Sequence, residues 1–357
     1  MEISRHLPND QVRVSFLCGA PLFSAPPLPL PGAQHLRTPW LRRFPWDKVK
    51  GGWRVRRLEF EWFEWRAARW VAKHQNDYDI IQVCELPNLV YWLKKFGVKV
   101  PIVMRLTAPN LYDPRGGAKA ADALIASGTT IEKLKNEHYE GVSGLDVTDI
   151  PNAVDPELFR PQPSDFRKRN GVGVDEFVVL YVARFQAFKN HAMLVEAFRL
   201  IRERYPSARL VLVGSGPLRE RIQQQAERAG IAGKVLFLGE VPFNELPAVY
   251  AAADLKVVTS DYESFCFAAI EAMSAGLPVL TTDCGWVPRL VADGAGLVSP
   301  VGDAPSFSCA MERLARDSGL RKRLGTAARE RVLDRHTWRP SAEKLMSVYQ
   351  RILTPVG

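Results

Sequence analysis

The stretch DYESFCFAAIEAMSAGLPVLTT, residues 261–282, carries two glutamates, Glu263 and Glu271, with seven residues between them. Runs of β-forming residues flank it, so we predict a strand, a helix that begins near Phe265, and a second strand. Glu263 would lie in the loop before the helix and Glu271 almost two turns inside it. A helix N-terminus attracts phosphate, and carboxylates accept hydrogen bonds from sugar hydroxyls. The spacing therefore suits a nucleotide-sugar site. The alternative is that Glu263 only caps the helix and Glu271 is an exposed carboxylate on it.

The segment upstream of this stretch predicts one half of a doubly wound α/β domain. Residues 178–183 form an apolar run that predicts a buried strand, the loop after it carries Arg184 and Lys189, and a helix is predicted from Asn190. Open α/β sheets bind their ligands at the carboxyl ends of the strands. Both cations are therefore expected at a ligand site.

A glycine-rich turn follows the next predicted strand. The apolar run 208–213 ends in Gly214 and Gly216, and a third run, 234–241, comes after the helix that follows. This alternation of strands and helices predicts a doubly wound parallel sheet. Glycine turns end many such strands, so the turn is a candidate wall of a ligand cleft only because of its position in this order.

Taken in order, these blocks make the chain resemble the family 4 glycosyltransferases, also called group 1, of the GT-B superfamily. The matching blocks are residues 150–161, the loop 184–190, LVLVGSGP at 210–217, the run 238–260, the two-glutamate stretch, and a tail with His336-Thr337-Trp338 and Tyr349. The resemblance implies an α/β fold of two Rossmann-like doubly wound domains that face each other across a cleft. It also implies a retaining transferase that moves a sugar from a nucleotide diphosphate sugar to a hydroxyl.

The chain length fits two domains of about 150 residues each. We expect an acceptor-side domain over residues 1–149, shortened or irregular, and a nucleotide-sugar-binding domain over residues 150–340. A helix over residues 341–357 is expected to return to the N-terminal domain.

The resemblance assigns catalytic roles to three charged residues. Cations that stabilise the charge developing on the departing diphosphate accelerate transfer more than they strengthen ground-state binding. Backbone N–H groups at residues 265–267 would assist them, and a carboxylate would hold the donor sugar. The expected catalytic residues are Arg184, Lys189 and Glu263.

The resemblance also assigns donor binding. Glu271 would accept hydrogen bonds from the ribose, and Val241 with Pro242 would line the base pocket. Relatives often have glycine at the position of Cys266, so we expect this backbone to avoid a positive φ. The expected donor-binding residues are Gly19, Gly214, Gly216, Val241, Pro242, Ser264, Phe265, Cys266, Phe267 and Glu271.

The N-terminal part matches the family less well. Residues 12–17 predict an opening strand with Gly19 at its turn, but the proline-rich stretch after it cannot form a regular helix. Relatives commonly carry a histidine after the strand predicted at 100–106. Thr107 stands there, so an imidazole role in binding the sugar is not supported. Further strands are predicted at 78–84 and 119–127 and a helix at 86–96.

Residues 35–74 are strongly basic and rich in tryptophan. They hold eleven Lys or Arg, four Asp or Glu and six of the nine tryptophans, so they carry seven of the chain's nine net positive charges. Such a segment suits an anionic membrane surface, with residues 37–53 in contact with lipid. The alternative is a core helix that leans on the strand at Tyr78, with Leu58, Trp62 and Trp65 on its inward face and Arg57, Glu61 and Glu64 on another.

Other ligand classes have weaker support. No nucleic-acid-binding module accompanies the basic segment, so nucleic acid is not an expected partner. Asp77-Tyr78-Asp79 has the D-x-D form of some metal sites, but it precedes a strand, and a loop is the favoured interpretation. No metal and no cofactor are expected besides the nucleotide diphosphate sugar as co-substrate.

The cysteine pattern and the hydropathy of the sequence indicate where in the cell the protein is expected. The five cysteines form no paired pattern, the N-terminus lacks a continuous apolar centre, and no apolar run is long enough to span a membrane. We expect a cytoplasmic protein, peripheral on the inner face of the membrane, that acts on a glycan or lipid-linked acceptor. The alternatives are a sugar-nucleotide epimerase of the same fold and a non-catalytic nucleotide-sugar-binding protein.

Overall fold

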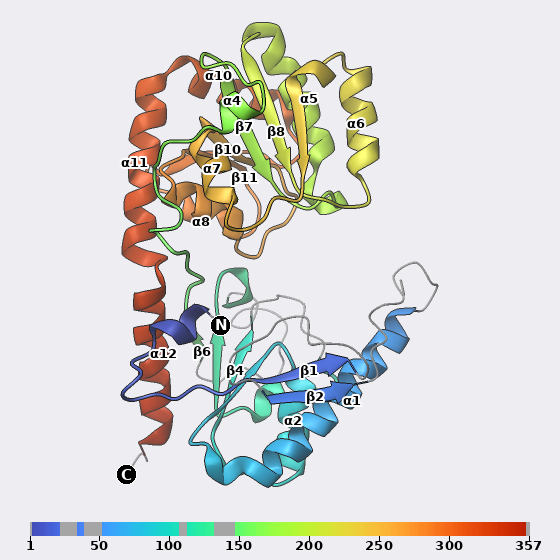
Figure 1. The fold of residues 1–357 in the computed structure, drawn as a ribbon, viewed down its shortest axis with the longest axis vertical. Helices are drawn as coiled ribbons and strands as arrows, with labels where there is room; N and C mark the ends of the chain where they lie inside the picture. The colour runs from blue at the N-terminus through green and yellow to red at the C-terminus, as the bar shows by residue number, and fades with distance from the viewer. Residues whose placement is uncertain (1, 22–33, 39–51, 107–112, 132–146, 355–357) are drawn as a thin grey trace. The chain divides into compact units, whose positions relative to one another are not determined.

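The computed structural model describes residues 2–21, 34–38, 52–106, 113–131 and 147–354 (Figure 1). The chain forms two compact units, one comprising Met1–Ile150 with Ala342–Gly357 and the other Pro151–Ser341. The divisions expected from the sequence, at 149/150 and 340/341, lie next to these limits. The last helix, α12 (Trp338–Leu353), crosses the second limit, so its final turns belong to the first unit.

The second unit is built on one sheet of six strands, all paired in parallel. Such a sheet is covered on both faces, and its strands are therefore apolar throughout rather than alternating. The spatial order is β12-β11-β10-β7-β8-β9. The strands are β7 (Phe177–Val182), β8 (Ala208–Val213), β9 (Val235–Gly239), β10 (Leu255–Val258), β11 (Val279–Thr282) and β12 (Gly296–Ser299).

Helices cover both faces of this sheet (Figure 1). One hydrophobic core lies under α7 and α8 and the other under α5, α6 and α10, while α11 contributes to both. The helices of this unit are α4 (Phe166–Arg169), α5 (His191–Arg204), α6 (Arg219–Arg228), α7 (Leu246–Ala251), α8 (Phe267–Ser274), α9 (Val287–Leu290), α10 (Ala304–Arg316) and α11 (Ser318–Arg335). The doubly wound domain predicted from the sequence is confirmed.

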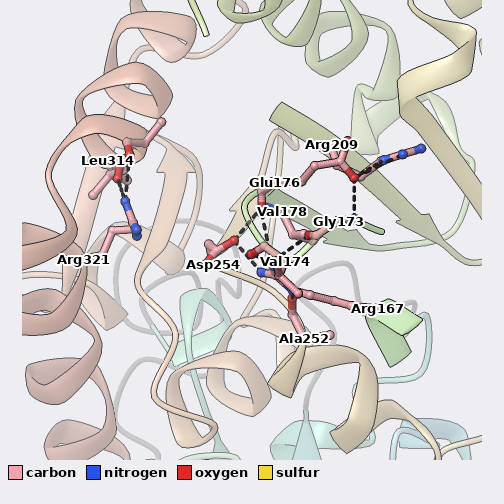
Figure 2. Close-up of polar contacts among 11 residues, drawn as sticks. Arg167, Gly173, Val174, Glu176, Val178, Arg209, Ala252, Asp254, Leu314 and Arg321 are labelled. Atoms are coloured by element: carbon pink, nitrogen blue, oxygen red, sulfur yellow. Dashed lines mark hydrogen bonds and ion pairs between the residues drawn. The ribbon is translucent and has the colours of Figure 1, made fainter. Parts of the chain in front are cut away.

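A polar network fixes the amino-terminal ends of β7 and β10 (Figure 2). The guanidinium of Arg167 donates to the Asp254 carboxylate at 2.7 Å and to the backbone oxygens of Ala252 and Glu176 at 2.9 and 3.0 Å. Asp254 in turn accepts from the Val178 amide at 2.8 Å. These contacts lie at the sheet edge opposite the carboxyl ends of the strands, so they anchor the sheet without occupying its ligand edge.

The first unit has a parallel four-stranded sheet in the order β3-β4-β5-β6 and a separate parallel pair, β1-β2. The predicted strands and helix beyond Tyr78 are confirmed. The elements are β1 (Leu17–Pro21), β2 (Gln34–Thr38), α1 (Gly52–His74), β3 (Ile81–Cys84), α2 (Pro87–Lys95), β4 (Ile102–Leu106), β5 (Ala123–Ala126) and β6 (Val147–Asp149).

The prediction for the opening strand was wrong. Gly19 lies inside β1, opposite Leu36 of β2, and not at a turn after a strand at residues 12–17. The partner strand lies beyond the proline-rich stretch, so distant pairing fixed the position of β1 and the local apolar pattern did not. Thr107, which stands where relatives have histidine, lies outside the described residues.

The core-helix interpretation of residues 52–74 holds, but its predicted inward face was wrong. Leu58 is 63% exposed, whereas Ala67 and Ala68 are fully buried and Glu64 is 3% exposed. Ala68 shares a hydrophobic core with Val90 and Leu93 of α2, and its small side chain allows the two helices to approach closely. The helix is thus turned away from the orientation that its tryptophans suggested. Trp65 packs at its edge, 6.4 Å from the Phe96 ring.

Within the described residues, no helix combines the length and the apolar character that crossing a membrane requires.

Candidate functional site

Loops at the carboxyl ends of β7 and β10 bring together two of the predicted catalytic residues. The ammonium group of Lys189 forms an ion pair with Glu263 Oε1, and the Ser260 hydroxyl donates to the same oxygen at 2.8 Å. Glu263 is 7% exposed. Arg184 lies on the same loop as Lys189 but is exposed, and it makes no side-chain hydrogen bond or ion pair with a described residue. The site therefore holds one neutralised cation and one that is open to a ligand.

Hydrogen bonds from two strands fix the backbone of the Lys189 loop. The Lys189 carbonyl accepts from the Tyr181 hydroxyl at 2.7 Å and from Thr259 Oγ1 at 3.1 Å. Asn190 adopts a left-handed conformation with φ 48°, caps α5 through the Met193 amide, and donates to Asp261 at 2.8 Å. The predicted helix start is confirmed, and the loop is tied to the end of β10.

The predicted glycine turn packs against the loop that carries Arg184. A Cβ on Gly214 would lie 2.1 Å from the Ala183 oxygen, and one on Gly216 would lie 2.6 Å from the Phe185 oxygen. Both glycines also have positive φ, 134° and 151°. Contacts this short exclude any side chain, so these glycines hold the backbone on either side of Arg184 in place.

Two details of α8 differ from the prediction. The helix begins at Phe267, so Glu271 lies just over one turn inside it and not almost two. Cys266 is the N-cap residue and has φ 71°, a left-handed conformation that was expected to be avoided. For a residue other than glycine, this conformation is less favourable by about 1–2 kcal/mol. The cap therefore keeps a glycine-like geometry in spite of its side chain.

The start of α8 presents unused backbone donors. Within the described part of the chain, the amides of Phe265, Cys266 and Phe267 donate to no acceptor. Phe265 is buried and its ring lies 5.6 Å from that of His336, while Phe267 is 48% exposed. Free amides at a helix N-terminus attract an anion. This end of α8 can therefore receive phosphate oxygens.

Glu271 is held by a buried tyrosine. Its Oε2 accepts a hydrogen bond from the Tyr250 hydroxyl at 2.7 Å. Burial raises the pKa of Glu271, and the bond from Tyr250 and the charge of Lys256 oppose that rise. The carboxylate is thus oriented by the protein before any ligand binds.

The remaining predicted residues are dispersed. Ser264 is half-buried in the loop before α8, and Val241 with Pro242 lies in the loop between β9 and α7. Gly19 belongs to the first unit and Gly214 to the second. Gly19 is therefore the one predicted site residue that belongs to a different unit from the others.

The sequence reasoning missed Gly285 and Lys256. A Cβ on Gly285 would lie 1.7 Å from the Glu263 oxygen, so this glycine allows the close contact that holds the Glu263 backbone. Lys256 is fully buried within β10. A charged residue inside the apolar strand LKVV was the available signal, because lysine is rarely fully buried.

The described residues include no group of three His, Cys, Asp or Glu side chains arranged to hold a metal ion. Asp77 ends a short 3-10 helix and Asp79 lies in the loop before β3. The D-x-D sequence thus precedes a strand, as the favoured interpretation expected.

Comparisons with known proteins agree with this fold. Residues 163–331 match the family model described as glycosyl transferases group 1. Sucrose-phosphate synthase from Thermosynechococcus elongatus has a similar structure, with a TM-score of 0.76, 23% identity, and coverage of 95% of this chain and 88% of that one. HepE of Anabaena in complex with UDP gives a TM-score of 0.68 at 22% identity, over 80% of this chain and 82% of that one.

A sequence relative is the GDP-mannose-dependent alpha-(1-6)-phosphatidylinositol monomannoside mannosyltransferase of Mycolicibacterium smegmatis. It is 32% identical over 207 residues, which are 55% of this chain and 54% of that protein. The chain spans about half the length of the first curated relatives it matches. The resemblance found in the sequence is confirmed: residues 163–331 match the group 1 glycosyltransferases, and the chain has the GT-B fold.

Proposed function

We propose that the protein is a retaining glycosyltransferase that moves a hexosyl group from a nucleotide diphosphate sugar to a hydroxyl of a glycan or lipid-linked acceptor. The observation that carries this proposal is the grouping of a free cation, an ion-paired cation, unused helix amides and two oriented carboxylates at one sheet edge. Cations and amides suit a diphosphate, and carboxylates suit hydroxyl groups.

In the proposed reaction, the bond between the anomeric carbon and the diphosphate oxygen breaks, and a bond to the acceptor oxygen forms. The diphosphate leaves with the electron pair and takes up the proton that the acceptor hydroxyl loses. Arg184, Lys189 and the amides at the start of α8 stabilise the charge on the leaving group, since preorganised donors act most strongly where charge develops. Retention of the anomeric configuration is proposed from the family resemblance.

The carboxylates position the donor. Glu271 accepts from the ribose hydroxyls and Glu263 from the sugar. Gly214 and Gly216 let the donor approach the backbone closely, and Val241 with Pro242 contacts the base. A relative named for GDP-mannose and a neighbour bound to UDP support a nucleoside diphosphate as the recognised group.

The proposed reaction needs no metal ion. Arg184 and Lys189 supply the positive charge that a divalent ion supplies in other transferases, and the described residues offer no cluster of metal ligands. The protein is therefore proposed to work without a bound metal or other cofactor.

We also propose a cytoplasmic location with peripheral attachment to anionic membrane through residues 37–53. The basic and tryptophan-rich composition of this part of the sequence supports the proposal, and most of it lies outside the described residues. Flotation with vesicles tests it. Binding to anionic vesicles, absence of binding to neutral ones, and loss on replacement of Arg42, Arg43, Lys48 and Lys50 by glutamine are expected; equal recovery with both lipids would contradict it.

The proposed activity is tested by incubating the full chain with a panel of nucleotide sugars. Release of nucleoside diphosphate that depends on an added acceptor is expected. An epimerase would convert the sugar without release, and a binding protein would do neither.

A further inference from the structure

Lys256 places an ammonium group inside the sheet beneath the donor site. It lies on β10, where it pairs with Leu180 of β7 and Val279 of β11, and its exposed fraction is 0%. Its Nζ donates to the Val257 carbonyl at 2.7 Å and lies 4.8 Å from the centre of the Tyr181 ring. Within the described part of the chain, no carboxylate forms an ion pair with it. The charge is therefore held by a carbonyl and an aromatic face.

A role in packing does not account for this lysine. Transferring an ammonium group from water into a protein interior costs several kcal/mol. One hydrogen bond to a carbonyl and one cation–π contact offset only part of that cost. An apolar side chain of similar length would fill the same space, and such replacements of buried charge are often neutral or stabilising. Packing alone therefore gives no reason for a lysine at this position.

Direct contacts connect Lys256 to the donor site. The Tyr181 ring beneath its ammonium carries the hydroxyl that donates to the Lys189 carbonyl and lies 3.3 Å from Ser260 Oγ. Ser260 donates to Glu263. The cation, the ring and the Lys189–Glu263 ion pair therefore form one buried network.

The groups that face this network come from each element packed around it. The loop after β7 contributes Lys189, the loop after β10 contributes Glu263, and α8 contributes Glu271 with the cap residue Cys266. On the α5 side, burial lowers the pKa of His191 to about 3, so this imidazole is neutral and adds no charge. Lys256 is thus a buried cation that interacts electrostatically with both carboxylates.

We propose that Lys256 is a positioning residue of the donor site: its buried ammonium group holds the Tyr181 ring and, through the Tyr181 and Ser260 hydroxyls, keeps the Lys189 loop and Glu263 in the arrangement that receives the donor beside Glu271. This inference rests on the proposed function, since it takes those carboxylates as donor-binding groups. Lys256 acts through them and through Tyr181, and touches no substrate itself.

The titration of these groups agrees with the geometry. Burial lowers the pKa of Lys256 to about 8, with Cys266 and Glu263 opposing that shift, so its positive charge is lost as the pH rises through about 8. The same charge opposes the rise that burial causes in the pKa of Glu271. Removing the charge should therefore shift protonation of Glu271 to higher pH.

The test compares Lys256→Met with wild type and with Lys322→Met, a control on the exposed face of α11. Binding of UDP and of GDP is measured by calorimetry between about pH 5 and pH 9, and unfolding temperature is measured on the same samples. We expect Lys256→Met to unfold at the same or a higher temperature. We expect it to bind the nucleotide at least about tenfold more weakly at neutral pH, with the acid limb of binding shifted to higher pH.

Wild type and Lys322→Met should lose affinity as the pH rises through about 8, and Lys256→Met should lack that limb. A folded Lys256→Met with wild-type affinity and an unchanged profile would overturn the inference and leave the proposed function intact. Wild type that binds neither nucleotide at any pH would overturn both. If Lys256→Met does not fold, the wild-type profile decides, because constant affinity up to about pH 9 would exclude a role for the lysine's charge.

Discussion

Lys189 and Glu263, 74 positions apart in the chain, form an ion pair at the carboxyl edge of the sheet, and the Ser260 hydroxyl donates to the same carboxylate oxygen. The pair joins the loop after β7 to the loop after β10. The ion pair therefore fixes the positions of these two loops relative to each other. It also leaves Arg184 as the cation on this loop that is open to a ligand.

Replacing Arg184 by alanine should abolish transfer and spare the fold. The side chain is exposed and unpaired within the described residues, so its removal should change the unfolding free energy by no more than about 0.5 kcal/mol. Loss of a donor to the leaving group should lower kcat by about 100-fold or more. Initial rates and thermal unfolding measure both effects, with Arg323→Ala on α11 as the control. Near wild-type turnover with a verified donor would refute the assignment.

Replacing Glu271 by glutamine should weaken nucleotide binding without unfolding the protein. The amide oxygen can still accept from the Tyr250 hydroxyl, so no buried donor loses its partner. Glu271→Ala leaves that hydroxyl unpaired and should lower the stability by a further 1–3 kcal/mol, roughly. Calorimetric titration with UDP and GDP and thermal unfolding separate the two variants. Unchanged affinity in Glu271→Gln would exclude this carboxylate from the ribose site.

Glu176 should make the second unit sensitive to acid. Its burial opposes ionisation, but bonds from Lys234, the Gly173 amide and Arg209 together lower its pKa to about 2. The unfolded state takes up the proton at higher pH than the folded state does. The stabilisation, up to about 3 kcal/mol, is thus complete above about pH 4.5 and is lost as the pH falls towards 2.

Urea unfolding at several pH values measures this dependence, and Glu176→Gln is the matched variant. The difference in stability between wild type and Glu176→Gln should shrink as the pH falls through that range. A difference that stays constant with pH would show that the carboxylate does not titrate as the contacts require.

Activity should persist in EDTA. The proposed reaction relies on Arg184 and Lys189 for positive charge, so removing divalent ions should change initial rates by less than about twofold. Rates are compared with and without chelator, and then after manganese is added back. Complete loss in chelator with recovery in manganese would contradict the metal-free mechanism and direct attention to Asp77 and Asp79.

The sequence predicted the C-terminal sheet well because its strands are apolar on both faces and bounded by glycine or charged loops. It also placed Lys189 and Glu263 near one edge, since parallel strands end together. It could not predict their ion pair, which depends on how two separate loops fold. The buried Lys256 carried a local signal, a charge within an apolar strand, but its contact with the Tyr181 ring of β7 could be seen only in the structure.

Other errors came from conformations that tertiary contacts impose. Cys266 keeps a positive φ because the α8 cap requires it, whatever the intrinsic preference of the side chain. In α1, Glu64 is buried and Leu58 exposed, because the buried side of the helix carries the small residues Ala67 and Ala68, of which Ala68 packs in the core with α2. A periodicity of large apolar residues does not reveal such a small-residue face.

The most direct test of the account is acceptor-dependent transfer by the full chain. Nucleotide sugars are incubated with and without lipid and glycan acceptors, and nucleoside diphosphate and glycosylated product are both quantified, with Arg184→Ala in parallel. The account predicts equal amounts of diphosphate and product, formed only when an acceptor is present and formed at least about 100-fold more slowly by Arg184→Ala. Sugar conversion without diphosphate release, or equal product from Arg184→Ala, would contradict it.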